Sequence, residues 1–236
     1  MILTIEDRAS DSPLVERVWR ASSQRAGEFL SIASPHWEIA ITRCQGRTFL
    51  TMRGPETSAT RAECPADGEW MGVRFKLGTF ATRWPPSLLR DRHDVTLPDA
   101  SSRAFWLDSS AWEYPDFENA EIFVRRLVRK GLIAHEPAVD AVLRGDPVAV
   151  SRRSLQRRFV GATGITHAAL RTIARARYAT CLLREGAPIL DVVHRAGYFD
   201  QPHLTRSLTR LIGQTPAEIA RARVQLSFLY KTAPPA

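Results

Sequence analysis

Residues 189–208 read ILDVVHRAGYFDQPHLTRSL, a pattern that predicts two short helices separated by a turn. The apolar residues of the first helix recur at helical spacing: Ile189, Val192, Val193 and Ala196. Gly197 ends this run, and Asp200 is placed to cap the second helix. The second helix repeats the apolar stripe at Leu204, Leu208 and Leu211. Such a pair is typical of a helix-turn-helix, the unit that places one helix in the major groove of DNA. Tyr198 and Phe199 are expected to fill the core of the turn.

Positive charge is concentrated in the last third of the 236-residue chain. Residues 151–236 hold 13 Arg and one Lys against two Asp and two Glu, a formal charge of +10, whereas residues 1–150 carry −2. Arginine outnumbers lysine 30 to 3, and its guanidinium binds phosphate or a guanine edge with two hydrogen bonds. This asymmetry favours a nucleic-acid partner; a basic surface that serves only solubility is the alternative.

Further helices are predicted around this pair. Ser151 is placed to cap a helix in which Leu155 and Phe159 face inward. A long helix is expected over residues 167–184, and at about 1.5 Å per residue it spans roughly 27 Å, which suits two DNA-reading helices about one DNA turn apart. The last short helix begins with a capping box made of Thr215, Pro216 and Glu218.

These helices carry a longer sequence pattern. Its first half is Ser151-x-x-x-Leu155-x-Arg157-x-Phe159 followed by Gly164, then Arg177 and the pair Leu182-Leu183. Its second half is Gly197-Tyr198-Phe199-Asp200-x-x-His203-Leu204-x-Arg206, then Gly213-x-Thr215-Pro216. On these residues, about 137–224 resemble the DNA-binding domain of the AraC/XylS transcriptional regulators. The resemblance implies two helix-turn-helix units joined by a central helix.

The resemblance also implies which side chains contact DNA. Base-edge readers are expected at Arg153, Gln156 and Arg157 on the first recognition helix, and at Gln201, His203 and Arg206 on the second. Thr205 belongs to the same DNA-binding set, and Arg158 is expected to contact phosphate or to be a solvated charge. Residues 146–150 lengthen the turn of the first unit, so its contacts are expected to be less regular than those of the second.

The first hundred residues predict short strands rather than helices. Residues 37–42 and 48–53 read as strands joined by a turn at Gln45-Gly46, and residues 71–76 read as another. Pro, Gly and Asp recur between these segments and indicate turns and loops. A barrel-like or mixed β domain is therefore expected, and at residues 72–78 and 92–97 it resembles the β-rich sensory portions of some AraC-type regulators.

Two features of this half leave alternatives open. All six Trp residues lie in it, which suits either an apolar ligand pocket or ordinary core packing. A connecting helix is expected from about residue 116, ended by Gly131. Its apolar residues Phe123, Leu127 and Val128 suggest a homodimer that uses this helix or a strand edge; the alternative is that they pack inside their own protomer.

Enzymatic and metal-dependent classes lack their motifs here. The six His residues are scattered without H-x-H or H-E-x-x-H, and no P-loop or dinucleotide fingerprint occurs, so no catalytic residue, metal or cofactor is predicted. Three Cys without C-x-x-C fit a reducing cytosol, with redox sensing at Cys44 and Cys64 as the alternative to buried thiols. Neither a signal sequence nor an apolar stretch of about 18 residues is evident, which predicts a cytoplasmic protein without membrane contact.

These patterns predict an α+β protein that is a one-component regulator of transcription. Its expected parts are a β-rich sensing domain at 1–115, a connecting helix at 116–134, a DNA-binding domain at 135–226 and a tail at 227–236. The expected partner is an operator in double-stranded DNA, with a small-molecule effector, RNA polymerase and a second copy of the chain as further candidates. The alternative is a constitutive DNA-binding protein whose N-terminal half serves only protein contacts.

Overall fold

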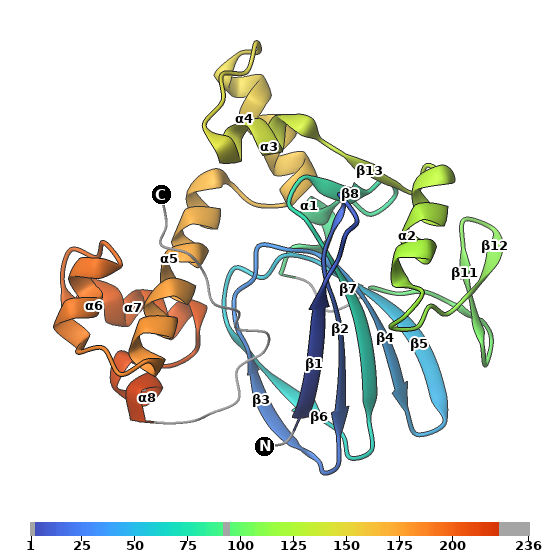
Figure 1. The fold of residues 1–236 in the computed structure, drawn as a ribbon, viewed down its shortest axis with the longest axis horizontal. Helices are drawn as coiled ribbons and strands as arrows, with labels where there is room; N and C mark the ends of the chain where they lie inside the picture. Colours follow the sequence, from blue (N-terminus) through green and yellow to red (C-terminus); the bar gives the residue numbers. More distant parts are fainter. Residues whose placement is uncertain (1–2, 92–94, 222–236) are drawn as a thin grey trace.

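A computed structural model describes residues 3–91 and 95–221 of the chain, and its N-terminal part is built on a six-stranded antiparallel sheet (Figure 1). In sheet order the strands are β1 (Leu3–Ala9), β2 (Val15–Ser23), β7 (Glu69–Phe75), β4 (Glu38–Cys44), β5 (Arg47–Arg53) and β9 (Val95–Thr96). Gln45 and Gly46 adopt positive φ angles in the tight turn between β4 and β5. The predicted strands at 37–42, 48–53 and 71–76 are thus confirmed to within two residues.

One face of this sheet builds the core of the N-terminal part. Alternation along the strands brings Ile39 and Ile41 of β4 opposite Val73 and Met71 of β7, all four buried. Helix α2 (Ala120–Arg129) packs on this face together with a small sheet of three strands. That sheet consists of β10 (Asp99–Ser101), β11 (Ala104–Leu107) and β12 (Ser110–Glu113), and the short helix α1 (Pro86–Leu89) precedes it in the chain.

The apolar stripe of α2 is occupied within the protomer. Phe123 and Leu127 are 5% and 1% exposed and belong to the same core as the sheet, whereas Val128 is 38% exposed. The reason is that the sheet face and β11–β12 offer apolar surface directly beside the helix, with Trp112 packed edge-on against Phe123. The burial of Phe123 and Leu127 agrees with the alternative that this stripe packs inside its own protomer, and dimerisation stays a prediction.

The opposite face of the sheet carries larger polar side chains and two Trp. Glu38 and Arg74 pair on this face, and Trp19 lies beside them with its indole N–H directed at Glu38. Strands β3 (Gly27–Ser31) and β6 (Thr60–Cys64) form a separate two-stranded ribbon. The ribbon lies between the sheet and the C-terminal helices (Figure 1).

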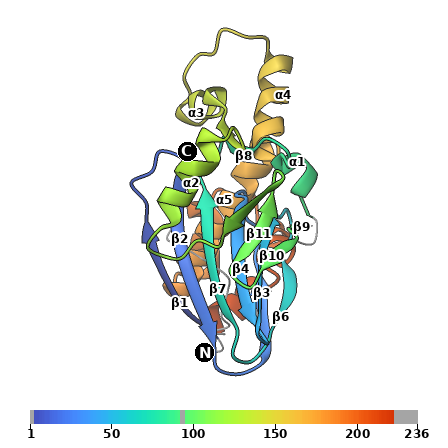
Figure 2. The ribbon, with the colours of Figure 1, turned by 90° about the vertical axis from the view of Figure 1, so that its right-hand side faces the viewer.

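The C-terminal part consists of helices, two pairs of which form helix-turn-helix units. In chain order they are α3 (Pro137–Arg144), α4 (Arg152–Thr163), α5 (His167–Arg184), α6 (Ile189–Arg195), α7 (Gln201–Leu211) and α8 (Pro216–Arg221). The units are α3–α4 and α6–α7, and α5 joins them with the bounds that the sequence predicts. Helices α3 and α4 project beyond the end of the sheet (Figure 2).

The two parts of the chain share secondary structure and core. Strand β8 (Thr79–Ala81) pairs with β13 (Ile133–His135), directly before α3. Ile32 and Ala33, from the N-terminal part, are fully buried in the hydrophobic core of the helices. The predicted domain boundaries remain a prediction, and their portions at residues 222–236 lie outside the described residues.

Candidate nucleic-acid interface

Helix α7 is positioned by its cap and by its buried stripe. The Asp200 carboxylate accepts a hydrogen bond of 2.7 Å from the backbone N–H three residues further on, and Pro202 occupies the first turn, where no N–H partner is needed. The stripe Leu204, Leu208 and Leu211 is at most 1% exposed. The opposite face exposes Gln201 and Arg206. Arg206 forms no ion pair or hydrogen bond with the residues that the structure describes, so its guanidinium can bind a ligand.

The turn before α7 is held by Tyr198. This side chain is 5% exposed, and its hydroxyl lies 3.1 Å from Ser207 Oγ. Burial raises the pKa of Tyr198. Phe199 is 91% exposed, so the expectation that it fills the core of the turn is wrong. Tyr198 already occupies the interior, and the next side chain along the chain therefore points to solvent.

Arg175 on α5 supports this turn, a role that sequence reasoning missed. Its guanidinium lies 4.7 Å from the centre of the Tyr198 ring and donates to the Gly197 carbonyl at 3.3 Å. The two segments are 22 residues apart, and no local pattern indicates that they meet. The contact fixes α6–α7 on the central helix.

His203 and Thr205 are engaged within the unit in the free protein. The His203 ring is half-buried and packs edge-on against Tyr198, with 5.1 Å between ring centres. The Thr205 hydroxyl donates to the Gln201 carbonyl at 2.9 Å. Their predicted contacts with DNA stay predictions, and each would have to be made in addition to these internal contacts.

Helix α4 is built in the same way as α7. Ser151 Oγ accepts from the Ser154 N–H at 3.2 Å, and Phe159 is buried on the inner face. Three predicted readers are exposed and form no hydrogen bond or ion pair with the described part of the chain: Arg153, Gln156 and Arg157. The turn from α3 to α4 spans residues 145–151, which confirms the lengthened turn expected from the sequence.

Arg158 lies on the side of α4 that meets α3. It forms a two-pronged ion pair with Glu136, with N–O distances of 2.7 and 2.9 Å. This pair holds the pKa of Glu136 below its ordinary value and raises that of Arg158. A phosphate contact by Arg158 stays a prediction, and it would compete with Glu136.

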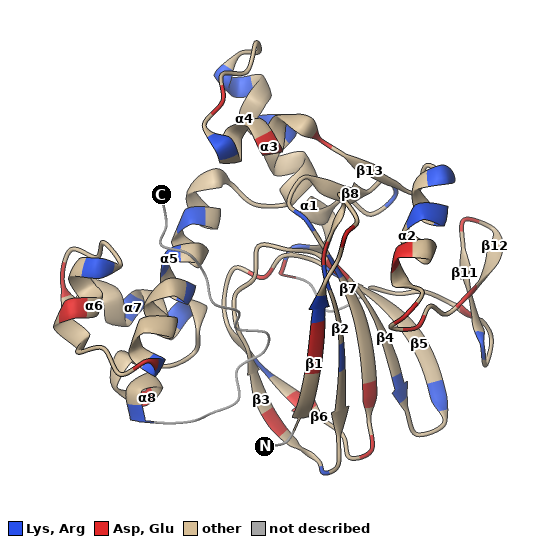
Figure 3. Cartoon of the chain, viewed as in Figure 1, with Lys and Arg blue, Asp and Glu red and all other residues tan. Residues whose placement is uncertain are grey.

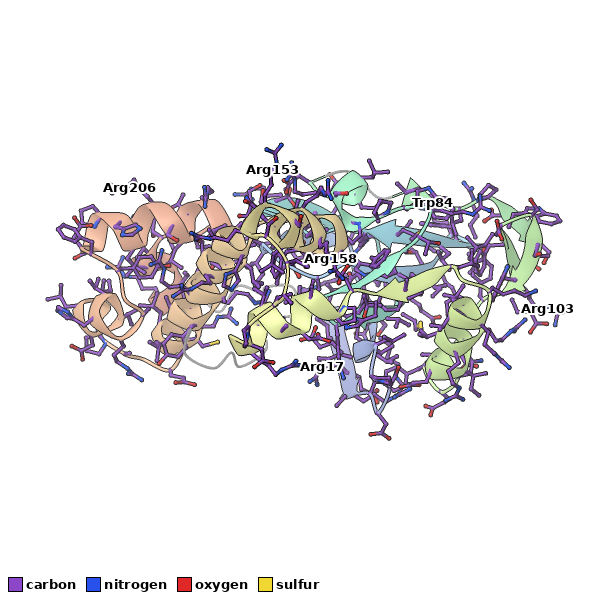
Figure 4. The ribbon with its side chains drawn as sticks, turned by 90° about the horizontal axis from the view of Figure 1, so that it is seen from above. Arg17, Trp84, Arg103, Arg153, Arg158 and Arg206 are labelled. Atoms are coloured by element: carbon purple, nitrogen blue, oxygen red, sulfur yellow. The ribbon has the colours of Figure 1, made fainter. Side chains whose placement is uncertain are left out.

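The two predicted reading helices share one side of the molecule. Arg153 on α4 and Arg206 on α7 lie along the same edge, whereas Arg158 lies back from it, toward α3 (Figure 4). Basic residues recur along α4, α5 and α7, while the strands carry charges of both signs (Figure 3). The 18 residues of α5, which joins the two units, span roughly 27 Å at about 1.5 Å per residue. This geometry can place two helices in successive turns of one major groove.

Metal sites, reactive cysteines and membrane-spanning helices are the other features to consider in the described residues. No group of three or more His, Cys, Asp or Glu side chains is arranged to hold a metal ion within residues 3–91 and 95–221. Cys44, Cys64 and Cys181 are free thiols, of which Cys64 is buried. Of the helices in the same ranges, none combines the length and apolarity needed to cross a bilayer.

Comparison with protein families agrees with this geometry. Residues 146–222 match the family model described as a helix-turn-helix domain. The match covers α4 to α8 and therefore includes both predicted recognition helices. Comparisons with curated proteins and with solved structures each gave no match.

Proposed function

We propose that this chain, whose C-terminal region is an AraC-type helix-turn-helix domain, regulates transcription by binding a specific DNA sequence through α4 and α7. The observation that carries the proposal is the pair of capped helices with unpaired basic side chains on one edge of the molecule (Figure 4). Phosphate contacts position such a domain, and base-edge contacts give it sequence preference. The proposed site of action is the cytoplasm.

The roles within the site follow from exposure and position. Arg206 and Arg157 are proposed to bind guanine edges, with Gln201, Gln156 and Arg153 reading neighbouring bases. His203 and Thr205 are proposed to contact the bases or backbone beside them. Arg158 is proposed to contact phosphate once DNA competes for it with Glu136.

Binding to DNA is tested with the full chain and duplexes from its own upstream region. Fluorescence anisotropy with a labelled duplex, in the presence of excess random duplex, gives specific affinity, and footprinting locates the site. We expect protection of two segments about one helical turn apart, because α5 separates the two units. Affinity that is equal for upstream and random duplexes would contradict sequence-specific regulation.

Control by a small-molecule effector through the N-terminal part is the second element of the proposal. Its support is the shared core, in which Ile32 and Ala33 pack among the helices, so that a change in the β domain acts directly on the DNA-binding domain. The alternative is constitutive DNA binding, with the β domain serving protein contacts. RNA polymerase and a second copy of the chain are proposed partners; sedimentation with and without operator tests the latter.

A further inference from the structure

Phe199 is the most exposed large hydrophobic side chain in residues 3–91 and 95–221. It is 91% exposed, whereas the next, Leu190, is 64% exposed. Phe199 directly precedes Asp200, the residue that caps α7. A hydrophobic residue at this position often packs against the fourth residue of the helix, which here is Leu204. Leu204 is fully buried while Phe199 remains exposed, so the phenyl ring contributes little to the core.

The backbone on both sides of Phe199 is held in place. Before it, the Tyr198 N–H donates to the Val193 carbonyl at 2.8 Å, and the Tyr198 ring is buried. After it, the Asp200 carboxylate accepts from the His203 N–H at 2.7 Å. The position of Phe199 relative to α7 is therefore fixed, although its ring forms no aromatic or cation–π contact with the part of the chain that the structure describes.

The backbone conformation of Asp200 places Phe199 on the proposed reading side of α7. Asp200 is extended, with φ −153° and ψ 173°, and successive side chains along an extended segment point to opposite sides. Phe199 and Gln201, on either side of Asp200, therefore point to the same side. Gln201 is exposed and is one of the proposed base readers. The N-terminal residues of a recognition helix are those that contact base edges, so Phe199 lies at the end of α7 that would enter the groove.

The chemistry of a phenyl ring limits what it can bind in a major groove. Base edges there present hydrogen-bonding groups and one apolar group, the C5 methyl of thymine. The ring has neither a charge nor a hydrogen-bond donor, so phosphate and guanine edges are not its partners. Burial of apolar surface against the thymine methyl is the interaction that remains.

We propose that Phe199 determines specificity by packing against the C5 methyl group of a thymine beside the bases that α7 reads. This inference rests on the proposed function, because it names a further contact of the same DNA interface. It predicts that the operator contains a thymine whose methyl group itself is recognised. This contribution is separate from the hydrogen bonds proposed for Gln201 and Arg206, which a methyl group cannot form.

The test replaces each thymine of the protected operator segments, in turn, by deoxyuridine, which lacks only the C5 methyl group. Fluorescence anisotropy with the full chain should show, at one thymine, about fourfold weaker binding of the deoxyuridine duplex, the affinity equivalent of one buried CH₂ group. Phe199→Ser should bind the thymine and deoxyuridine duplexes equally at that position. Its affinity for random duplex should equal that of the wild type, because no charge is removed.

Trp106→Ser is the matched control. It replaces another exposed aromatic side chain, 47% exposed in β11 of the β domain, and should keep the preference for thymine. The inference is overturned if deoxyuridine weakens wild-type binding at no thymine, or if the folded Phe199→Ser variant keeps the wild-type preference. A loss of affinity for all duplexes alike in Phe199→Ser would make the role of the ring structural and would also overturn it.

The same titrations separate this inference from the proposed function. If the wild-type chain prefers the upstream duplex over random duplex but does not recognise the methyl group through Phe199, only the inference is wrong. Equal affinity for upstream and random duplexes overturns the proposed function.

Discussion

At Tyr198 and Phe199, two adjacent aromatic residues have opposite surroundings. The Tyr198 ring packs against the Arg175 guanidinium, and its hydroxyl forms a hydrogen bond with Ser207. Phe199, in contrast, is 91% exposed. The sequence pattern treats both as turn-filling aromatics, because hydrophobicity alone does not say which of two neighbours points inward. An exposed Phe beside the first turn of α7 adds an apolar surface next to the predicted reading face.

We expect substitutions at these two positions to differ in their effect on stability. Tyr198→Phe removes the hydroxyl and leaves Ser207 without this partner, which should lower the free energy of unfolding by about 1 kcal/mol. Phe199→Ser should change it by no more than about 0.5 kcal/mol, since exposed positions tolerate replacement. Urea denaturation of both variants measures this contrast. A loss of 2 kcal/mol or more in Phe199→Ser would mean that the ring is packed in solution.

Glu121 makes the free energy of unfolding depend on pH in the acidic range. Arg8 on β1 binds its carboxylate at 2.6 and 2.9 Å, Ser10 donates to it at 2.8 Å, and the Arg8 hydrogen bonds lower the pKa of Glu121 to about 2. Because the folded pKa lies below the unfolded one, the stabilisation is present above about pH 4.5 and is lost as pH falls toward 2.

Glu121→Gln should therefore destabilise the protein at pH 7 but not at pH 2. We expect a difference of about 1 to 2 kcal/mol at pH 7, reduced by solvent screening because Arg8 is one-third exposed. Glu113→Gln, at an exposed position of β12, is the matched control and should show no such pH dependence. Thermal unfolding across pH 2 to 7 gives the comparison, and a difference that persists at pH 2 would assign the effect to packing instead.

At the scale of elements, the helices were the most predictable part of the fold. Their ends are marked by local residues that cap or stop a helix: Ser151 caps α4, Asp200 caps α7, and Gly197 follows the end of α6 with a positive φ. The ribbon β3–β6 was not predicted, because its pairing depends on partners about 30 residues apart and not on a local turn. The Arg158–Glu136 pair was missed for the same reason.

Arg206 on α7 and Arg157 on α4 should act on DNA differently from Arg158, which lies on the side of α4 that meets α3. Arg206→Ala should lose discrimination at defined operator positions, by about 1 to 3 kcal/mol for a guanine contact. Arg157→Ala should act in the same way but more weakly, because the long turn before α4 makes the first unit less regular. Arg158→Ala should weaken all duplexes alike and reduce the salt slope by about one.

Affinity for operator variants and for random duplex, at several salt concentrations, separates these roles. Each variant is compared with Arg103→Met, which replaces an exposed arginine of the β domain, far from both reading helices (Figure 4). If Arg206→Ala weakens every sequence equally, Arg206 is a phosphate contact and not a base reader.

At the scale of the whole molecule, the separation into a β domain and a DNA-binding domain is less complete than the charge split indicates. Leu30, Leu77 and Phe80 pack against the helical core in addition to Ile32 and Ala33. The sequence predicts each half from its own periodicity, yet it contains no local signal for surfaces that meet across more than 100 residues. A cavity of about 590 Å³ is lined by side chains of the β domain and by Arg177 of α5. The sequence could not predict the part that Arg177 plays in it, although the six Trp residues of the first half suggested a ligand pocket as one alternative.

The last turn of α7 makes this dependence measurable. Its carbonyl groups at Arg210 and Leu211 accept hydrogen bonds of 2.9 and 2.8 Å from Ala59 and Ala33 of the β domain. A fragment of residues 135–236 loses these bonds and exposes the apolar surface that the β domain covers, although each helix keeps its own caps.

We therefore expect the fragment 135–236 to be helical and to bind the same operator, with a melting temperature at least about 10 °C below that of the DNA-binding domain in the full chain. The fragment 1–134 should bind no DNA, because the excess positive charge lies elsewhere. Circular dichroism and anisotropy on both fragments test this. If the fragment 1–134 binds DNA, the assignment of the interface is wrong. If the fragment 135–236 is as stable as the full chain, the shared core contributes nothing to the stability of the helical part.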